Sequence, residues 1–573
     1  MKKLFLFVAL SLFVAMSCDK IDTPQEDDQG TVTEKPTTPA EPVYGENEVI
    51  GKVVYNDGKP AAGLKVSDGF SITVTDEKGE YRFKTAGKPV RYIYISYPSD
   101  ASITAAADGT LDFYKKYQST EHVYDFTLKR QPVEQKFAIF ALADPQAHYE
   151  ARGTQKYADT DRFAAETVPA VNAQIALQTV PCYGISLGDI AYSEGSRDSS
   201  PSMEIMKNHL AKVNMPVFNI IGNHDFTYYK ADAAISTTEE NPSVNLLSQR
   251  SFEQVFGPVN YSFDRGNVHF VCMKNVHFNS TTKWDGKDYT CGFTDKEYNW
   301  LKQDLAKTPK TMKVVLCVHI PISTNTDKPK VQDVQSLLAQ FDDSMIFSGH
   351  THYQQAVYDG DRLYEKIHPA VCGQWWWSNI SGDGCPNGYT VYQFDNKQIV
   401  DSYLIGVNEE MNSKDYQIRM YDGDITTGGK YARFKMPYTY DGTYKFYMIN
   451  VFNGDPKWKV KVFENGVYAG EATLLTTTTE SFSSVSAGTT YDLPFGTNKD
   501  WWAIGYHIGV CNRGTSSTSF YTLNYHMWCW ASTNPSAKIT VEAVDPHGRT
   551  YSCDEIITDG EAYPDYIKAP LNI

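Results

Sequence analysis

The sequence predicts an α/β domain flanked on both sides by β-rich domains, and three observations lead to this prediction. Between residues 136 and 405, apolar strand-like runs alternate with amphipathic helical stretches, which is typical of α/β domains. In residues 47–130, and again in residues 406–573, short alternating runs are separated by turn residues, which indicates β-sheets. A chain of 573 residues is also too long for one ordinary core, so several domains are expected.

Composition limits the possible partners. Hydrophobic residues make up 41% of the chain, which is enough to build globular cores. The formal net charge is -16, so the basic surface typical of nucleic-acid-binding proteins is not expected. An anionic substrate would have to be attracted by a local positive centre.

The first residues have the pattern of an export signal. Residues 1–17 begin with two lysines and continue with an apolar stretch that is too short to span a membrane. The run Ala15-Met16-Ser17-Cys18 resembles a lipobox, which predicts lipid attachment at Cys18 and a periplasmic, outer-membrane or surface-attached lipoprotein. The alternative is an ordinary signal peptide that ends near a chance cysteine.

Residues 18–46 are rich in Thr, Pro, Glu, Asp and Gln, so we expect a flexible linker. Residues 47–130 contain short strand-like runs between Gly, Asp and Pro turns, which predicts a small antiparallel β-sandwich. The order GKVVYNDGKPAAGLKVSDGF…TDEKGEYRF resembles transthyretin-like domains that precede exported bacterial enzymes.

The α/β region contains the runs FAIFALA, CYGISLG, VFNIIG, NVHFVCM, KVVLCVH and SMIFSG, all predicted to be strands. Apolar residues at helical spacing predict helices in DRFAAETVPAVNAQIALQ and in TDKEYNWLKQDLAK. The second of these opens with Thr294 and Glu297, the pattern of a capping box.

Cysteine usage argues against a disulfide framework, because nine cysteines remain after Cys18 and none forms a CxxC pair. Cys372 and Cys385 flank a Trp-rich loop, and whether they pair is left open.

The residues that carry the chemistry follow the ends of five predicted strands. They are Asp144, Gln146, Asp189, Asn223, His224, Asp225, His319, His350 and His352. Taken singly, each has an ordinary explanation: a turn, a helix N-cap or a hydrogen-bonded core histidine. Because ligands bind at the carboxyl ends of strands in open α/β sheets, their joint placement predicts one shared site.

These motifs, GD, GNHD and GHTH with Asp144, Gln146 and His319, resemble the calcineurin-like metallophosphoesterase family. The resemblance covers about residues 136–405, and the flanks resemble exported bacterial members with a β-rich C-terminal domain. It implies a four-layer sandwich in which helices flank two mixed β-sheets.

The resemblance also implies a two-metal centre with Asp189 as the shared ligand. One ion would bind Asp144, Gln146, Asp189 and His352, and the other Asp189, Asn223, His319 and His350. These carboxylate, amide and imidazole ligands, without a thiolate, suit Mn, Fe, Zn or similar ions. Two divalent ions outweigh two carboxylates, so the centre would be positive enough to attract phosphate.

By the same resemblance, a metal-activated hydroxide would attack phosphorus, and His224 would act as general acid with Asp225 orienting its ring. Most relatives have His where Gln146 stands, so the first ion is expected to bind less tightly or more selectively. Tyr192 matches the spacing of the tyrosinate ligand in purple acid phosphatases, but we expect a wall residue here.

Other residues are candidates for substrate contact. His148 either contacts substrate or faces solvent, and both readings stay open. Trp375, Trp376, Trp377, Asn387 and Tyr389 form a candidate substrate rim, and the alternative is that these aromatics bury the junction with the C-terminal domain. The predicted substrate is a small phosphate ester, with a diester slightly favoured over a monoester. An exported binding module without catalysis is the competing hypothesis, and the oligomeric state stays open.

Overall fold

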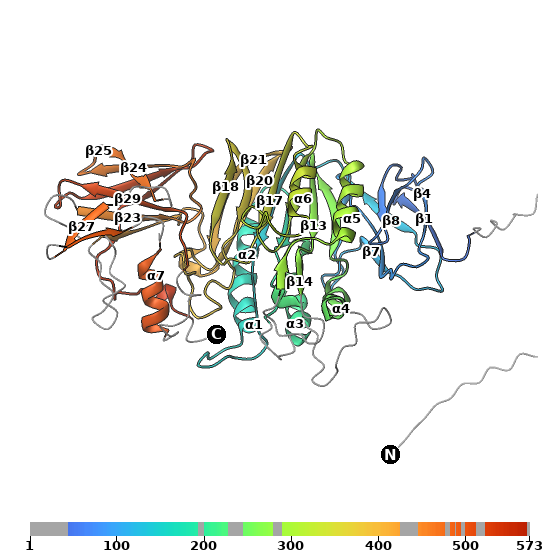
Figure 1. Cartoon of the computed structure of the whole chain (residues 1–573), viewed down its shortest axis with the longest axis horizontal. Coiled ribbons are helices and arrows are strands. Elements are labelled where there is room, and N and C mark those ends of the chain that lie inside the picture. Colours follow the sequence, from blue (N-terminus) through green and yellow to red (C-terminus); the bar gives the residue numbers. More distant parts are fainter. Residues whose placement is uncertain are drawn as a thin grey trace, which may run out of the picture. The chain divides into compact units, whose positions relative to one another are not determined.

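The structure, a computed structural model, describes residues 44–192, 200–226, 244–278, 289–423, 445–475, 482–486, 489–493, 499–511 and 522–569 (Figure 1). The predicted signal peptide, Cys18 and nearly all of the predicted linker lie outside these residues. Contacts divide the chain into Met1–Gly45 and Glu46–Ile573, and every element described below belongs to the second unit.

The N-terminal domain has two small sheets. The first has the strand order β4 (Glu80–Lys84), β1 (Glu48–Tyr55), β8 (Phe126–Arg130), β6 (Ala101–Ser102). The second has the order β3 (Ile72–Val74), β2 (Lys65–Ser67), β5 (Tyr92–Ile95), β7 (Tyr114–Lys116). The prediction of an antiparallel sandwich is wrong at one pair, because β1 and β8 run parallel. The whole domain separates these two strands in sequence, so no tight hairpin forces them to be antiparallel.

The α/β domain contains two stacked sheets. The first sheet has the order β11 (Val217–Asn219), β10 (Cys182–Ser186), β9 (Lys136–Leu142), β20 (Gly388–Asp395), β21 (Gln398–Gly406). The second has the order β12 (Asn260–Arg265), β13 (Val268–Met273), β16 (Lys313–Cys317), β17 (Asp343–Ser348), β19 (Arg362–Ile367), β18 (Gln355–Asp359). A short hairpin of β14 (Val276–Phe278) and β15 (Tyr289–Cys291) stands apart from both.

Both sheets are mixed. β9, β10 and β11 run parallel, and β20 joins β9 antiparallel. In the second sheet β13, β16, β17 and β19 run parallel, with antiparallel strands at both edges. Aromatic rings join the sheets: Phe218 stacks on Phe263 at 3.7 Å between ring centroids, and Phe347 stacks on Tyr392 at 4.6 Å. The parallel strands of both sheets therefore bring their carboxyl ends to one region.

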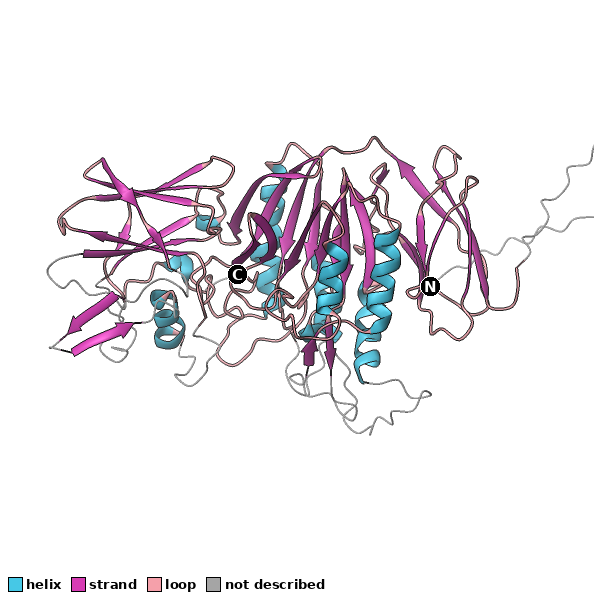
Figure 2. Ribbon diagram, turned by 45° about the horizontal axis from the view of Figure 1, so that its top comes forward, coloured by secondary structure: helices cyan, strands magenta, loops and turns pink. Residues whose placement is uncertain are grey.

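Helices cover the outer faces of these sheets, which gives the expected four layers (Figure 2). They are α1 (Asp159–Arg162), α2 (Val168–Ala176), α3 (Ser200–Leu210), α4 (Val244–Phe256), α5 (Asp295–Ala306) and α6 (Val331–Leu338). α2 packs on the first sheet, where Tyr389 donates its hydroxyl hydrogen to the Ala170 carbonyl at 3.2 Å. α5 begins with the predicted capping box, because the Thr294 and Glu297 side chains bond each other's backbone amides.

The first predicted helix contains a local irregularity. Between α1 and α2 the backbone forms one π-helical turn, Phe163–Thr167, so the helical segment is continuous but locally wider. π-Turns inside helices are frequent near functional sites. The turn directly follows Arg162, which donates to the Trp376 carbonyl at 2.5 Å and to Asn379 Oδ1 at 2.7 Å.

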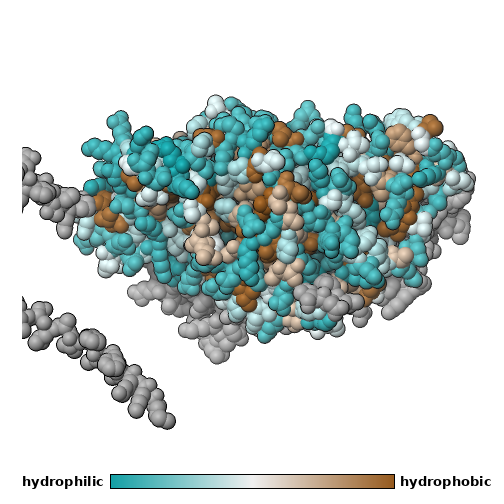
Figure 3. Space-filling model, turned by 180° about the vertical axis from the view of Figure 1, so that it is seen from behind, coloured by the Kyte–Doolittle hydropathy of each residue, from teal (hydrophilic) through white to brown (hydrophobic). Residues whose placement is uncertain are grey.

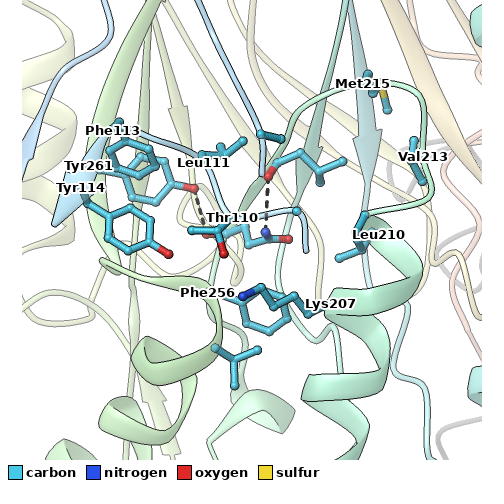
Figure 4. Close-up of a pocket in the computed structure, with 16 residues that line it drawn as sticks. Thr110, Leu111, Phe113, Tyr114, Lys207, Leu210, Val213, Met215, Phe256 and Tyr261 are labelled. Atoms are coloured by element: carbon cyan, nitrogen blue, oxygen red, sulfur yellow. Dashed lines mark hydrogen bonds between the residues drawn. The ribbon is translucent and has the colours of Figure 1, made fainter. Parts of the chain in front are cut away.

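The N-terminal domain and the α/β domain share one continuous hydrophobic core, which contains both Val53 and Val315. The backbone continues this contact, because Asp264 donates its N–H to the Tyr97 carbonyl at 2.7 Å. Figure 4 shows part of the junction, where Leu111, Phe113 and Tyr114 lie near residues of α3, α4 and the segments that follow these helices. The two domains therefore pack across a largely apolar surface, which also contains the ion pair between Lys65 and Asp304.

The C-terminal domain is all-β, as expected, apart from α7 (Trp501–Gly505) and a π-helical turn, Tyr506–Val510. One sheet has the order β26 (Thr473–Leu474), β29 (Met527–Ser532), β23 (Lys445–Val451), β22 (Ile418–Asp422), β32 (Ile556–Ile557). The other has the order β25 (Val467–Glu471), β24 (Lys459–Glu464), β30 (Ile539–Val544), β31 (Thr550–Cys553). A separate hairpin is formed by β27 (Phe482–Ser486) and β28 (Thr489–Leu493).

The surface is polar on the face drawn in Figure 3, where hydrophobic residues are interspersed among hydrophilic ones. Within the described ranges, no helix has the length and apolar character needed to cross a membrane.

Candidate metal centre

Five strand ends bring the predicted ligands together. Asp144 and Gln146 follow β9, and Asp189 follows β10. Asn223 opens a short 3₁₀ turn after β11. His319 follows β16, and the GHTH motif follows β17. The first group comes from one sheet and the histidines from the other, so the site lies where the carboxyl ends of the two stacked sheets meet.

The backbone at these positions is unusual. Asp144, Gln146, Asp189, His350 and His352 all have positive φ angles, between 38° and 71°. Non-glycine residues rarely adopt this region, and such strain gathers at functional sites. The left-handed backbone turns each side chain away from its strand direction and toward the centre.

Glycines beside the ligands permit this crowding. A Cβ atom at Gly222 would lie 2.2 Å from Asp189 Oδ1, and one at Gly349 would lie 2.6 Å from Asp144 Oδ2. A Cβ atom at Gly188 would lie 2.6 Å from His319 Nδ1. The Gly residues of the GD, GNHD and GHTH motifs are therefore required by close packing around the ligands.

Asp189 lies at the middle of the cluster and is fully buried. Its Oδ2 accepts a hydrogen bond from Gln146 Nε2 at 2.7 Å and lies 3.2 Å from His319 Nε2. Its Oδ1 accepts the His224 backbone N–H at 2.7 Å. His319 Nε2 also lies 3.0 Å from Asn223 Oδ1. This carboxylate therefore touches ligands of both predicted groups, as the shared position requires.

Asp144 forms the second focus of the cluster. Its Oδ2 accepts the His350 backbone N–H at 2.8 Å, and its Oδ1 lies 3.5 Å from His352 Nε2. Among the described residues, none provides a hydrogen bond to this buried Oδ1. A buried carboxylate oxygen without a partner is costly, and a cation would satisfy it.

The donor geometry fits metal ions. The donor atoms of Asp189, His319 and His350 lie within 4.8 Å of one another, and His350 Nδ1 is 3.2 Å from His319 Nε2. Outer nitrogens are anchored as in metal sites: His319 Nδ1 donates to the Leu187 carbonyl at 2.8 Å, and His352 Nδ1 donates to the Gly373 carbonyl at 3.1 Å. Such anchoring fixes the tautomer and leaves Nε2 facing the centre.

Electrostatics point the same way. Burial lowers the pKa of His319, but the Asp189 carboxylate outweighs burial and raises this pKa to about 9. Burial and the nearby His319 lower the pKa of His350 to about 3. The two carboxylates therefore demand positive charge that the crowded imidazoles cannot all carry, and divalent ions would supply it.

Asp225 ties two ligand loops together. Its Oδ1 accepts the Ala191 N–H and its Oδ2 accepts the Gly222 N–H, both at 2.8 Å. Burial, and then the charge of Asp189, raise the pKa of this carboxyl to about 7. These bonds connect the GD and GNHD loops, so Asp225 fixes the backbone of both loops relative to each other. That Asp225 orients the His224 ring stays a prediction.

The predicted acid His224 lies against Tyr192. The two rings are stacked with centroids 5.0 Å apart, and the Arg152 guanidinium lies 4.3 Å from the centroid of the same Tyr192 ring. His148 is buried beside this group, with its ring 6.4 Å from that of Tyr192. Tyr192 thus lies beside His224, and its role as a wall residue stays a prediction.

The Trp-rich loop divides into two parts. The Trp375 ring lies 5.1 Å from that of His352, next to the cluster. Trp376 is only 1% exposed and donates its indole N–H to the Pro145 carbonyl at 2.8 Å. Asn387 is fully buried and donates to the Ser378 carbonyl. The expectation that Trp376 and Asn387 line a substrate rim is therefore wrong, because both side chains are buried. Trp376 holds the loop that carries Asp144 and Gln146, and Asn387 holds the segment that follows the tryptophans. Tyr389 is also buried, beneath α2.

Cys372 and Cys385 are both free, so the possible disulfide is not formed. The Cys372 thiol lies 3.8 Å from Gln146 Oε1 and 3.8 Å from His352 Nδ1, behind the ligands. Cys385 belongs to a separate buried group with Asp383 and His526 near the C-terminal domain. In this group Asp383 also accepts backbone N–H groups, from Gln354 and Cys385.

Sequence reasoning missed three neighbours of the centre. The Tyr289 hydroxyl is 3.5 Å from His350 Nε2, and Arg152 packs on Tyr192. Asn275 uses its Oδ1 to accept the His319 and Ile320 N–H groups and so shapes the His319 loop. Each stands alone in the sequence, outside any motif, so only the fold brings it to the site.

Three family models match the chain. They are "N terminal of Calcineurin-like phosphoesterase" over residues 47–131, "Calcineurin-like phosphoesterase" over residues 175–354, and "C terminal of Calcineurin-like phosphoesterase" over residues 365–551. The central match contains Asp189, Asn223 and all three ligand histidines.

Two curated relatives are similar over part of the chain. Purple acid phosphatase 23 of Arabidopsis thaliana is 26% identical over 195 residues, which is 32% of this chain and 38% of that protein. The manganese-dependent ADP-ribose/CDP-alcohol diphosphatase of Mus musculus is 24% identical over 222 residues, which is 30% of this chain and 64% of that protein. The matches thus span less than two thirds of either relative.

Among solved structures, a dimetal phosphatase from Danio rerio is similar to this chain, at 14% sequence identity and a TM-score of 0.29. That match covers 47% of this chain and 99% of the other. A purple acid phosphatase from yellow lupin (Lupinus luteus) seeds matches at 12% identity and a TM-score of 0.30, over 60% of this chain and 69% of the other.

Proposed function

Because the chain belongs to the calcineurin-like phosphoesterase family, whose members are hydrolases acting on phosphoric ester bonds, we propose that it hydrolyses small phosphate esters at this centre. One observation supports this above all: Asp189 lies in contact range of ligands from both stacked sheets, with Gln146 on one side and His319 on the other. Such a shared carboxylate is what a two-metal hydrolytic site needs.

The residues divide between two ions. Asp144, Gln146 and His352 would hold one ion, Asn223, His319 and His350 the other, and Asp189 would bind both. The bound ions would supply Lewis-acid polarisation of the phosphate and a lowered pKa for a bound water. Oxygen and nitrogen donors without a thiolate suit Mn, Fe or Zn ions. The donor set of this chain is compatible with all three metals.

His224 is proposed to protonate the leaving oxygen. Its backbone is fixed by the N–H bond to Asp189, and its ring is supported by the Tyr192 face. The imidazole is thus adjacent to the ligands but is not one of them, which is the place for a general acid. Asp225 holds the loop that carries it, through the bonds to Ala191 and Gly222.

A phosphodiester is proposed as the slightly favoured substrate, and a phosphomonoester is the alternative. Aromatic rings line the approach on several sides: Tyr192 beside His224, Tyr289 beside His350 and Trp375 beside His352. These faces suit an apolar or planar ester group on either side of the phosphate.

The test uses full-length protein loaded with Mn²⁺ and assayed on bis-p-nitrophenyl phosphate and p-nitrophenyl phosphate. We expect hydrolysis that is lost on chelation and restored by metal. His224→Ala should keep its metal and lose turnover by roughly 10²–10⁴-fold on an alkyl ester. Asp342→Asn, a change at an exposed carboxylate, is the control. Activity on neither compound, with metal bound, would favour the binding module instead.

Export and lipid attachment at Cys18 are part of the proposal and rest on the sequence alone. Mass spectrometry of the mature protein from its native membrane would decide. A diacylglyceryl group on an N-terminal Cys18 supports the proposal, and a mature chain that begins at another residue contradicts it.

A further inference from the structure

A second cleft lies far from the metal centre, where the two stacked sheets meet the C-terminal domain. Its volume is about 610 Å³, within the range of small-molecule sites. Its lining comes from β16, β17, β18 and β19 of one sheet, β20 and β21 of the other, and two segments of the C-terminal domain, which connect β23 to β24 and β30 to β31.

The cleft begins at the edge of the sheet opposite the metal ligands. Lys313 and Asp343, which line it, are the first residues of β16 and β17. His319 lies six positions beyond Lys313, a span of roughly 20 Å. Lys366 lies farther along the sheet, because it pairs with Phe347 near the end of β17. The candidate metal ligands are not among the residues that line the cleft.

Lys366 is the notable residue of this cleft. It is only 4% exposed, and its ammonium group has no hydrogen bond or ion pair with any residue that the structure describes. The nearby Asp455 carboxylate is already engaged, because it accepts the Tyr358 hydroxyl at 2.9 Å and the Lys457 N–H at 2.7 Å. Burial lowers the pKa of Lys366 to about 8, so the amine still carries a proton at neutral pH. A buried ammonium without a partner is costly.

The other cations of the cleft have partners. Lys313 pairs with Asp343 at 2.8 Å, and Lys457 pairs with Asp361. Arg362 donates to Ser344 Oγ at 3.1 Å and to Asp359 Oδ2 at 3.2 Å. Among the described residues, Lys366 is therefore the lysine of the cleft without a direct hydrogen bond or ion pair, and the nearby Asp455 carboxylate partly offsets its charge.

Asn453 supplies a second unsatisfied group. It is 2% exposed and donates from Nδ2 to the Ser402 carbonyl at 3.1 Å, whereas its Oδ1 has no hydrogen-bond partner among the described residues. This Oδ1 atom is closed to solvent, so it lies behind the wall of the cleft, whereas Lys366 lines the cleft. Trp458, Leu363 and Ile399 add apolar surface beside them.

We propose that this cleft binds a small organic anion: an acidic oxygen pairs with Lys366, and an apolar or planar body rests near Trp458. The ligand is a carboxylate, sulfonate or phosphate of modest size. This site is separate from the proposed phosphoesterase centre.

The neighbouring cavity at the N-terminal junction does not compete with this site. Its volume is about 50 Å³, room for little more than water, and Figure 4 shows Thr110 and Lys207 among the apolar and aromatic side chains that line it. Its cation, Lys207, pairs with Asp108 at 2.9 Å.

The test is a fluorescence titration of the metal-loaded full-length protein with 8-anilino-1-naphthalenesulfonate, an organic anion with a planar body. We expect saturable binding that Lys366→Met weakens at least tenfold, whereas Lys414→Met, at an exposed lysine, leaves it unchanged. N-phenyl-1-naphthylamine, which lacks the sulfonate, should bind both proteins equally. No saturable binding of the sulfonate, or an unchanged affinity in folded Lys366→Met, overturns the proposal.

If Lys366→Met does not fold, the Ile399→Trp variant tests the proposal instead. Ile399 is partly buried and lines the cleft, so the larger tryptophan side chain would fill it. Loss of binding then supports the site, and unchanged binding overturns it. Hydrolysis of bis-p-nitrophenyl phosphate is measured on every variant. An inactive metal centre with intact dye binding would refute only the proposed hydrolysis, so the two failures remain distinguishable.

Discussion

The rings of Tyr192 and His224 are stacked, with centroids 5.0 Å apart and planes inclined by 14°. Arg152 contacts the same phenol ring at 4.3 Å and is anchored by Asp159 at 2.8 Å. A cation, a phenol and an imidazole therefore form one stack beside the metal ligands. The stack limits the rotation of the His224 ring, so the proposed acid is held before a substrate arrives.

Removing the stack should slow turnover without removing metal. Tyr192→Ala loses an aromatic contact worth about 0.5–1.5 kcal/mol, so we expect kcat to fall by roughly 3–10-fold. Tyr192→Phe keeps the ring and should remain near wild type. Steady-state kinetics with bis-p-nitrophenyl phosphate and elemental analysis of both variants would check this. Loss of metal from Tyr192→Phe would instead identify the phenol oxygen as a ligand.

The placement of the candidate ligands at strand ends could be predicted from the sequence, because these residues follow short apolar runs that favour buried strands. The β9 and β10 runs lead directly into Asp144 and Asp189, and the Gly residues in the motifs mark close approach. The left-handed backbone at these positions could not be predicted, because Asp and His adopt it more often than most residues but still rarely, and Gln shows no such enrichment.

The remaining features depend on contacts between distant segments. The parallel pairing of β1 with β8 joins strands from the two ends of a domain, and alternation within each strand does not specify its neighbour. In the run of three tryptophans, the sequence predicts Trp376 to be a binding residue. It is buried, and its indole N–H donates to the Pro145 carbonyl. Tyr289 and Arg152 reach the site only through tertiary packing.

Two glycine substitutions should disrupt the centre directly. A methyl group at Gly222 would lie 2.2 Å from Asp189 Oδ1, and one at Gly349 would lie 2.6 Å from Asp144 Oδ2. We expect Gly222→Ala and Gly349→Ala to lower the bound metal and reduce activity by at least tenfold. Gly58→Ala has open space around it but a positive φ, so it should cost only about 1 kcal/mol of stability and leave metal content unchanged. Full metal content in Gly222→Ala would argue against the assigned role of Asp189.

Gln146 offers a test of metal affinity. Its Nε2 bonds Asp189 and its Oε1 lies 3.8 Å from the Cys372 thiol, so the amide has to turn over for its oxygen to bind an ion. Imidazole is a better donor than an amide oxygen, so Gln146→His should hold the first ion roughly tenfold more tightly. Competition with a chelator, followed by residual activity, measures this. Gln146→Ala should release the ion at lower chelator concentration than the wild type, and identical curves for all three proteins would exclude Gln146 as a ligand.

The junction of the first two domains predicts a dependence of stability on pH. Asp304 is 1% exposed and accepts from Lys65 Nζ at 2.8 Å and from His269 Nε2 at 2.6 Å. Burial raises the pKa of Asp304, but Lys65 and His269 outweigh burial, so its folded pKa lies below the unfolded value of about 3.9. Its contribution is therefore complete above the unfolded pKa and is lost as pH falls further.

Asp304→Asn should destabilise the protein by roughly 3 kcal/mol near neutral pH, because it leaves Lys65 and His269 buried without their counter-ion. The difference in unfolding temperature between wild type and variant should narrow as pH falls from 5 to 3. The control is Asp295→Asn, on the same helix as Asp304. It removes an exposed ion pair with Lys330 and should cost less than about 1 kcal/mol. Calorimetry at each pH makes the comparison. A difference that stays constant down to pH 3 would mean that the Asp304 charge does not stabilise this junction.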